Sequence, residues 1–377
     1  MKILIPSSVS ALLERLEQAG YEAYLVGGCV RDAYMGIAPQ DYDITTSALP
    51  EQTKEVFRNA RVIETGLAHG TLTVLTENGP VEITTYRQDG DYSDHRHPDA
   101  VYFTRSLEED LARRDFTINA MAMDGRQNLV DLFGGRADID AKIVRCVGDA
   151  EHRFEEDALR ILRALRFAAR FGFSLEAQTQ AAMQGKKELL KTVAAERIFA
   201  ELCGLLKGDY AAETLAEYRE VAEVILPELR GFHRLKKLPP DPAMRLAAVL
   251  QKESADLALT QLKAPNIFKK TVRMLLENED VLQPENEREL HRLAIALGGE
   301  NLQTLYIWRG WNRAPLLDFF KKSPCLSIRD LAVDGKDLMA LGLKGSAIGE
   351  IQKYLLEQVA EGLPNDKEKL IEAIKNR

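Results

Sequence analysis

One short segment, residues 24–46, restricts the fold of this chain more than any other part of the sequence. The apolar run at 24–26 is typical of a buried strand. It ends in a glycine pair whose second member is Gly28, and a short helix carrying Arg31 is expected to start around Val30. Glycines between a strand and a helix let backbone N–H groups approach a phosphate at the positive end of the helix. Because Arg31 adds a bidentate anion donor, the segment predicts a phosphate-binding turn.

Two aspartates, Asp41 and Asp43, follow this turn at alternate positions. Alternate residues of a strand point to the same face, so we expect both carboxylates to converge. Convergent carboxylates suit Mg²⁺, which proteins usually hold through one or two carboxylates together with substrate phosphates. A phosphate-binding turn beside such a pair predicts metal-assisted phosphoryl or nucleotidyl transfer.

The length of 377 residues predicts two or more domains, and the ordinary apolar and charged fractions are typical of a globular protein. No stretch of eighteen apolar residues occurs, so no membrane helix is expected. The four cysteines lie far apart without a Cys-x-x-Cys pattern, which predicts reduced thiols in a cytoplasmic protein. A formal net charge of −8 argues against general nucleic-acid affinity, although it leaves room for a local basic surface.

The region between the first motif and residue 123 holds three further features. Alternating runs at 71–75 and 81–86 predict a β-hairpin, in which Glu82 is either a third metal-side carboxylate or an exposed strand residue. Residues 89–99 are polar and rich in turn formers, which predicts a mobile loop. Residues 113–120 read Arg-Arg-Asp-Phe-Thr-Ile-Asn-Ala, which by themselves are typical of a helix with an ordinary charged end.

Residues 153–167 predict an amphipathic helix with a charged side. That side carries four charged residues spaced by three, Asp157, Arg160, Arg163 and Arg166. They form either an ordinary solvated face or a binding surface for a polyphosphate. A carboxylate accepts from the exocyclic amine of cytosine or adenine, and a guanidinium donates to the adjacent ring nitrogen, whereas uracil presents the opposite polarity. An Asp157–Arg160 pair would therefore accept CTP and ATP and reject UTP without a nucleic-acid template.

These motifs resemble those of the class II tRNA nucleotidyltransferases, the CCA-adding enzymes of the polymerase-β-like superfamily. The resemblance covers roughly residues 20–205 and rests on Gly-Gly-x-x-Arg-Asp, Asp-x-Asp, Arg-Arg-Asp, the loop from residue 89 and Glu-Asp-x-x-Arg at 156–160. It implies that Asp41 and Asp43 are catalytic and bind Mg²⁺. It implies nucleotide binding by Gly28, Arg31, Arg114, Asp157, Arg160, Arg163 and Arg166. It also assigns Asp115 to a ribose motif, and we expect a structural ion pair between Arg197 and Glu201.

The resemblance implies an α+β fold, with a polymerase-β-like nucleotidyltransferase head that holds a mixed sheet, followed by an all-helical neck, body and tail. We place the catalytic head at 1–148, the base-recognising neck at 149–207, the body at 208–300 and the tRNA-binding tail at 301–377. The expected partners are tRNA, CTP and ATP. Neither a membrane nor a protein partner is indicated.

The implied reaction is template-independent addition of C, C and A to the tRNA 3′ end, with release of pyrophosphate. An enzyme that adds only A has the same motifs, so the sequence leaves this alternative open. Enzymes that add only CC lack the loop seen here at 89–101, and bacterial poly(A) polymerases usually extend into a basic tail that this chain lacks. A catalytically inactive RNA-binding protein is a further alternative, against which the intact Asp41 and Asp43 argue.

Overall fold

The computed structural model describes residues 5–90, 100–226 and 229–377. The chain divides into two compact units. The first comprises Met1–Phe232 together with Gln261–Lys263, and the second comprises His233–Thr260 together with Ala264–Arg377. The main β-sheet belongs to the first unit and the second unit is helical, so the predicted α+β class is confirmed.

The main sheet has the strand order β3-β4-β5-β2-β1-β8-β9. β2 and β5 pair in parallel and the other neighbours are antiparallel, so the sheet is mixed, as predicted. Its strands are β1 (Ala23–Val26), β2 (Asp43–Thr46), β3 (Val62–Gly66), β4 (Thr71–Thr76), β5 (Gly79–Thr85), β8 (Met121–Met123) and β9 (Leu129–Asp131). The predicted hairpin is confirmed as β4 and β5.

Two smaller sheets accompany the main one. β6 (Arg87–Asp89) pairs antiparallel with β7 (Val101–Phe103), and β10 (Ile143–Val144) pairs in parallel with β11 (Ser174–Leu175). The predicted mobile loop of residues 89–99 runs between β6 and β7, and from residue 91 to residue 99 it lies outside the described residues.

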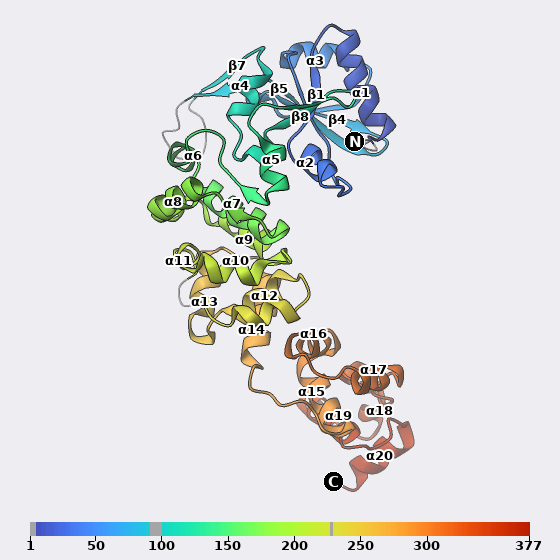
Figure 1. Ribbon diagram of the computed structural model, residues 1–377. Helices are drawn as coiled ribbons and strands as arrows, with labels where there is room; N and C mark the ends of the chain where they lie inside the picture. The colour runs from blue at the N-terminus through green and yellow to red at the C-terminus, as the bar shows by residue number, and fades with distance from the viewer. Residues whose placement is uncertain (1–4, 91–99, 227–228) are drawn as a thin grey trace. The chain divides into compact units, whose positions relative to one another are not determined.

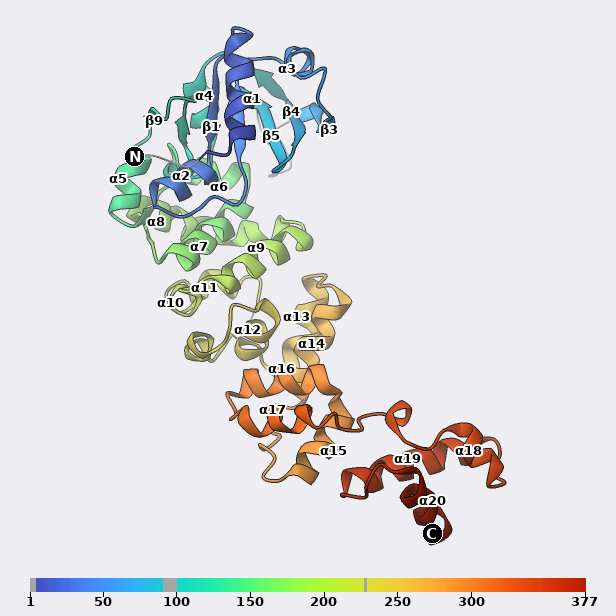
Figure 2. The ribbon, with the colours of Figure 1, turned by 90° about the vertical axis from the view of Figure 1, so that its right-hand side faces the viewer.

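Helices pack on the sheet of the first unit and continue after it (Figure 1). α1 (Ser7–Gln18) packs against β1 and α3 (Pro50–Val56) (Figure 2). It buries an apolar face that includes Leu13 and Leu16. The other helices of this unit are α2 (Gly28–Tyr34), α4 (Leu107–Ala112), α5 (Gly135–Asp140), α6 (Ala150–Glu156), α7 (Leu159–Phe171), α8 (Ala177–Lys186), α9 (Ala195–Lys207), α10 (Ala211–Glu217) and α11 (Arg219–Ala222).

The prediction of a single helix over 153–167 is wrong, because the helix is interrupted at Asp157. α6 ends at Glu156, Asp157 is extended with φ −142° and ψ 101°, and α7 begins at Leu159. Asp157 Oδ1 accepts a hydrogen bond from the Leu159 N–H at 3.1 Å. A carboxylate that satisfies an unpaired N–H at a helix start offers the backbone an alternative to continuing the preceding helix. α7 nevertheless buries the predicted apolar face, which includes Ile161 and Leu165.

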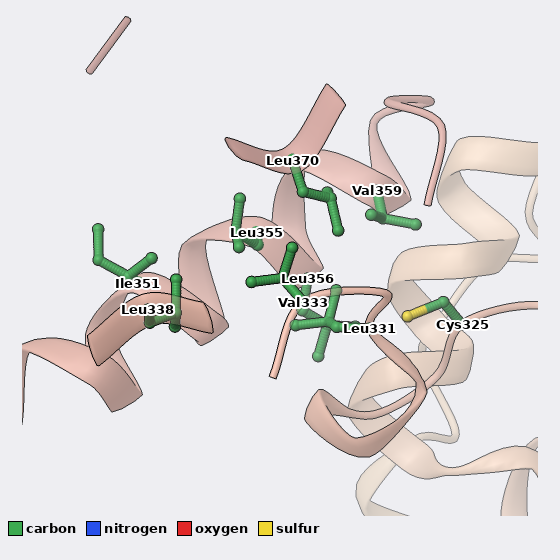
Figure 3. Close-up of a cluster of buried hydrophobic side chains, with 9 residues drawn as sticks. All are labelled: Cys325, Leu331, Val333, Leu338, Ile351, Leu355, Leu356, Val359 and Leu370. Atoms are coloured by element: carbon green, nitrogen blue, oxygen red, sulfur yellow. The ribbon is translucent and has the colours of Figure 1, made fainter. Parts of the chain in front are cut away.

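The chain beyond residue 240 forms the helices α12 (Pro242–Val249), α13 (Lys252–Gln261), α14 (Asn266–Glu277), α15 (Glu287–Leu297), α16 (Gly299–Arg309), α17 (Ala314–Lys321), α18 (Gly335–Ala340), α19 (Ser346–Ala360) and α20 (Lys367–Lys375). The last three share an apolar core, to which α18 contributes Leu338, α19 contributes Leu355 and α20 contributes Leu370 (Figure 3). All four cysteines are free thiols. None of the helices in the described part of the chain combines the length and the apolar character needed to cross a bilayer.

Candidate active site

A polar cavity of about 310 Å³ opens between α2, the residues that lead into β2, the segment 114–119 and α7. Most of the residues predicted for the site meet here. The cavity is lined by Gly27, Gly28, Arg31, Asp32, Gln40, Asp41, Asp43, Arg114, Asp115, Asn119, Arg163, Arg166, Phe167 and Arg170. The predicted residues Asp157 and Arg160 are not among these lining residues.

The turn between β1 and α2 depends on Gly27 more than on the predicted Gly28. Gly27 has φ 77° and ψ −129°, a conformation that residues with a Cβ rarely adopt. A Cβ at this position would also lie 3.2 Å from Nη1 of Arg114. Gly28 begins α2 and lines the cavity directly. The two glycines together bring the backbone to the cavity wall.

Asp41 and Asp43 both line the cavity, but strand alternation does not bring them there. β2 begins at Asp43 and Asp41 precedes it, so the predicted strand position of Asp41 is wrong. Glu82, whose role the sequence left open, is the register partner of Asp43 across the parallel β2–β5 pair. Burial of the carboxyl, together with the negative charges of Asp41 and Glu82, raises the pKa of Asp43 to about 6.

These donors fit a divalent cation. Carboxylate oxygens are hard ligands, and a bound cation offsets both the burial and the repulsion that raise the pKa of Asp43. Among the described residues, no group of three or more acidic, histidine or cysteine side chains is arranged to hold a metal on its own. The fit therefore rests on Asp41 and Asp43, with substrate phosphates supplying further oxygens.

Arg31 is buried and fixed from several directions. Its Nε and Nη2 donate to Asp32 Oδ1 at 2.8 and 2.6 Å, and Nη1 donates to Asn119 Oδ1. Its guanidinium carbon lies 5.1 and 4.9 Å from the ring centroids of Phe167 and Phe171. Burial lowers the pKa of Arg31 and the charge of Asp32 opposes this shift. Because a guanidinium has five N–H donors, Arg31 keeps donors for a cavity anion.

Asp115 holds a second arginine at the cavity. Its Oδ2 accepts from Nε and Nη2 of Arg163 at 2.8 and 2.6 Å. Its Oδ1 accepts from Asn119 Nδ2 at 3.0 Å and from the Phe116 N–H at 2.8 Å. Burial on its own would raise the pKa of Asp115, but Arg163 and the other donors outweigh it and hold the pKa at about 2. Asp115 is therefore an ionised anchor for Arg163.

Arg114 and Arg166 also belong to the basic wall of the cavity. Arg114 Nη2 lies 3.2 Å from Oδ2 of the buried Asp110, and within the described residues its buried Nε has no hydrogen-bond partner. Arg166 Nε donates to Glu201 of α9 at 2.5 Å, and Arg163 Nη1 lies 3.6 Å from the same carboxylate. These carboxylates fix the guanidinium groups without removing all of their donors.

The predicted ion pair between Arg197 and Glu201 is wrong. Glu201 pairs with the arginines of α7, and Arg197 Nη2 donates to Asp157 Oδ2 at 2.7 Å. An i, i+4 pair on one helix is worth only about 0.2–0.5 kcal/mol. Because α7 packs directly on α9, the arginines of α7 and the carboxylate of Asp157 come within reach and replace this weak pair.

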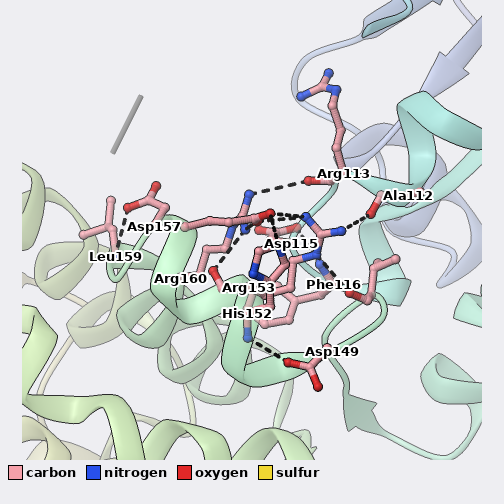
Figure 4. Close-up of polar contacts among 12 residues, drawn as sticks. Ala112, Arg113, Asp115, Phe116, Asp149, His152, Arg153, Asp157, Leu159 and Arg160 are labelled. Atoms are coloured by element: carbon pink, nitrogen blue, oxygen red, sulfur yellow. Dashed lines mark hydrogen bonds and ion pairs between the residues drawn. The ribbon is translucent and has the colours of Figure 1, made fainter. Parts of the chain in front are cut away.

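Asp157 and Arg160, which the base-reading hypothesis expects to bind a base edge together, are each engaged with other protein groups. Asp157 accepts from the Leu159 N–H and from Arg197, while Arg160 Nη1 donates to the Glu156 carboxylate and, at 3.0 Å, to the Arg153 carbonyl. Figure 4 shows Arg160 beside Arg153, whose own guanidinium reaches the Ala112 carbonyl at 2.8 Å. The donor–acceptor edge predicted for the base is therefore not preformed, and both side chains must exchange partners to create it.

The structure adds cavity residues to which the sequence had assigned no role. Asp32 follows Arg31 directly, and Asn119 lies four positions after Asp115 in a motif that was already singled out. Arg170 follows Arg166 by one helical turn, so the spacing of the α7 arginines contained the signal for it.

The site is that of a nucleotidyltransferase head. A glycine turn follows the first strand, paired aspartates lie at the start of the next strand, and arginines line the cavity. A family model for the "Poly A polymerase head domain" matches residues 23–145. A model for the "Probable RNA and SrmB- binding site of polymerase A" matches 172–232, and one for tRNA nucleotidyltransferase domain 2 matches 243–374.

Whole-chain comparisons narrow this class. The CCA-adding enzyme of Lactobacillus delbrueckii subsp. bulgaricus is 39% identical over 370 residues, covering 93% of this chain and 92% of the relative. That of Latilactobacillus sakei subsp. sakei is 36% identical and covers 97% and 96%. The crystal structure of the Bacillus stearothermophilus CCA-adding enzyme in complex with CTP superposes with a TM-score of 0.82 at 32% identity and covers 99% of both chains. The chain belongs to the family of CCA-adding enzymes.

Proposed function

We propose that this chain adds C, C and A to the 3′ end of tRNA from CTP and ATP, releasing pyrophosphate. The observation that carries the proposal is a single cavity in which Asp41 and Asp43 face the arginines of α2 and α7. The relatives named above support the reaction, and the fold supports the class of chemistry.

We further propose that Asp41 and Asp43 hold Mg²⁺ during catalysis. The bound ion would lower the pKa of the tRNA 3′-hydroxyl and neutralise charge on the triphosphate. The protein's own contribution is positional: Gly28 at the start of α2 and the side chains of Arg31 and Arg114 bind the phosphates. Arg163 and Arg166, fixed by Asp115 and Glu201, extend the same basic wall along α7.

Base selection is assigned to Asp157 and Arg160. In the structure these residues are engaged with Arg197 and Glu156. A cytosine or adenine edge offers the complement that each side chain needs when it leaves its present partner, whereas a uracil edge offers neither. Binding of any base therefore costs the free energy of the two present contacts, and only a cytosine or adenine edge offsets that loss.

We retain the four-part division into a head at 1–148, a neck at 149–207, a body at 208–300 and a tRNA-binding tail at 301–377 as part of this proposal. The free thiols at all four cysteines and a tRNA substrate support a cytoplasmic location.

The proposal is tested by offering tRNA that lacks its 3′ end to the purified chain with CTP, with ATP or with both, and by sizing the products on a sequencing gel. We expect two added nucleotides with CTP alone and three with both. Addition of a single A to tRNA ending in CC, with no C addition, would identify the enzyme that adds only A, which has the same motifs. The Asp43→Ala variant is the negative control.

A further inference from the structure

Asp32 lies between two arginines that come from different parts of the first unit. Its Oδ1 accepts from Arg31 of α2, and its Oδ2 accepts from Arg170 Nη2 of α7 at 2.9 Å. Asp32 is 6% exposed, so both contacts are made out of bulk water. Buried hydrogen bonds to ionised partners are short and strong, and here they set the orientation of both guanidinium groups.

Arg170 has the exposure and the donors of a ligand-binding group. Its side chain is 40% exposed and lines the same cavity as Asp41 and Asp43. Among residues 5–90, 100–226 and 229–377, its guanidinium has one hydrogen-bond partner, Asp32, and it stacks on Phe171 with 4.8 Å between the guanidinium carbon and the ring centroid. Four of its five N–H donors therefore have no partner within the described structure.

The groups around Asp32 carry an excess of positive charge, which a bound anion would neutralise. One carboxylate serves two guanidinium groups, so this side of the cavity keeps a net positive charge. An ion pair that only braced α2 against α7 would need no more than one arginine and one carboxylate. A second arginine that shares the carboxylate and opens on the cavity is the arrangement expected for binding a polyphosphate.

We propose that Arg170 is a further phosphate-binding residue, which contacts the incoming nucleoside triphosphate and the pyrophosphate product, and that Asp32 is the positioning residue that aims it. This inference rests on the proposed function. Arg170 touches the substrate, whereas Asp32 acts through Arg170 and Arg31.

The test measures binding of magnesium pyrophosphate, CTP and CMP by isothermal titration calorimetry, with no tRNA present. We expect Arg170→Ala to raise the Kd for CTP and for pyrophosphate about tenfold, the size expected for loss of one partly exposed charge-assisted contact. The Kd for CMP should change less than twofold. Arg170→Lys keeps the charge but loses the planar fork, and it should recover part of the affinity.

Asp32→Asn tests the positioning role. Because it acts through Arg170, the double variant Asp32→Asn/Arg170→Ala should weaken pyrophosphate binding by less than the product of the two single effects. Arg219→Ala is the matched control, since Arg219 forms an exposed ion pair with Glu223 on the same compact unit and lies outside the cavity lining. It should leave every Kd unchanged.

Two results would overturn the inference. If Arg170→Ala lowers the melting temperature and leaves the Kd for CTP and pyrophosphate within twofold of wild type, the Arg170–Asp32 contact is only a brace. If the single effects multiply in the double variant, Asp32 does not position Arg170. A wild-type chain that binds neither CTP nor pyrophosphate would instead contradict the proposed function, so the two failures are distinguishable.

Discussion

Asp115→Asn isolates one charge that the structure assigns to holding the active site together. The carboxyl has a pKa of about 2 against an ordinary value of 3.8, because the donors of Arg163 and Asn119 outweigh its burial. A shift of nearly two units corresponds to about 2–3 kcal/mol of the free energy of unfolding at neutral pH. Asparagine keeps the shape but replaces one of the two acceptor oxygens with an NH2 donor, so the variant loses the charge and one acceptor.

The pH dependence gives this prediction its sign. The folded pKa lies below the unfolded value, so the stabilisation is fully present above about pH 4 and is lost as the pH falls towards 2. The variant should therefore be less stable than wild type by about 2 kcal/mol at pH 7, and the difference should shrink to roughly half or less by pH 2.5.

The assay must report on the first unit, because both tryptophans, Trp308 and Trp311, lie in the second. Pulsed hydrogen exchange along a urea series, read at peptides from α7 and from the main sheet, meets this need. A difference below about 0.5 kcal/mol at pH 7, or one that is the same at pH 7 and pH 2.5, would refute the reasoning.

The remaining predictions concern catalysis. Asp41→Ala and Asp43→Ala should each abolish nucleotide addition and leave the Kd for tRNA within about threefold, because phosphate and RNA contacts lie elsewhere; near-normal turnover with Mg²⁺ would show that the metal assignment is wrong. Asp157→Ala should slow incorporation of CTP and ATP and lose discrimination against UTP, measured by steady-state kinetics with all four triphosphates; unchanged rejection of UTP would assign base reading to another group. Deletion of Gly90–His97 should leave C addition largely intact and stop A addition on a product gel, because a pocket that serves both bases must change between them; equal loss of both additions would argue against a role in switching.

Much of the fold follows from patterns that are local in the sequence. The apolar run that becomes β1, the glycine turn after it and the hairpin of β4 and β5 were predictable because each depends on a few adjacent residues. The grouping of Asp41 and Asp43 was also predicted, although for the wrong reason, since Asp41 precedes the strand.

The errors concern choices that tertiary packing decides. Periodicity continues smoothly across residues 153–167 and gives no sign of the interruption at Asp157, where the backbone is extended and the carboxylate binds the Leu159 N–H and Arg197. Spacing on α9 favours a pair between Arg197 and Glu201, but α7 lies against α9 and supplies better partners for both charges. A sequence pattern gives the positions of charges along one helix and not the charges that a neighbouring helix brings to them.

Intact-mass analysis of a single reaction tests the central claim most directly. The purified chain is incubated with tRNA that lacks its 3′ end and with all four nucleoside triphosphates together, and the product RNA is weighed by mass spectrometry. We predict a product heavier by two cytidylates and one adenylate, with no uridylate or guanylate. No mass increase on this substrate, an added uridylate, or a long run of adenylates would contradict the account.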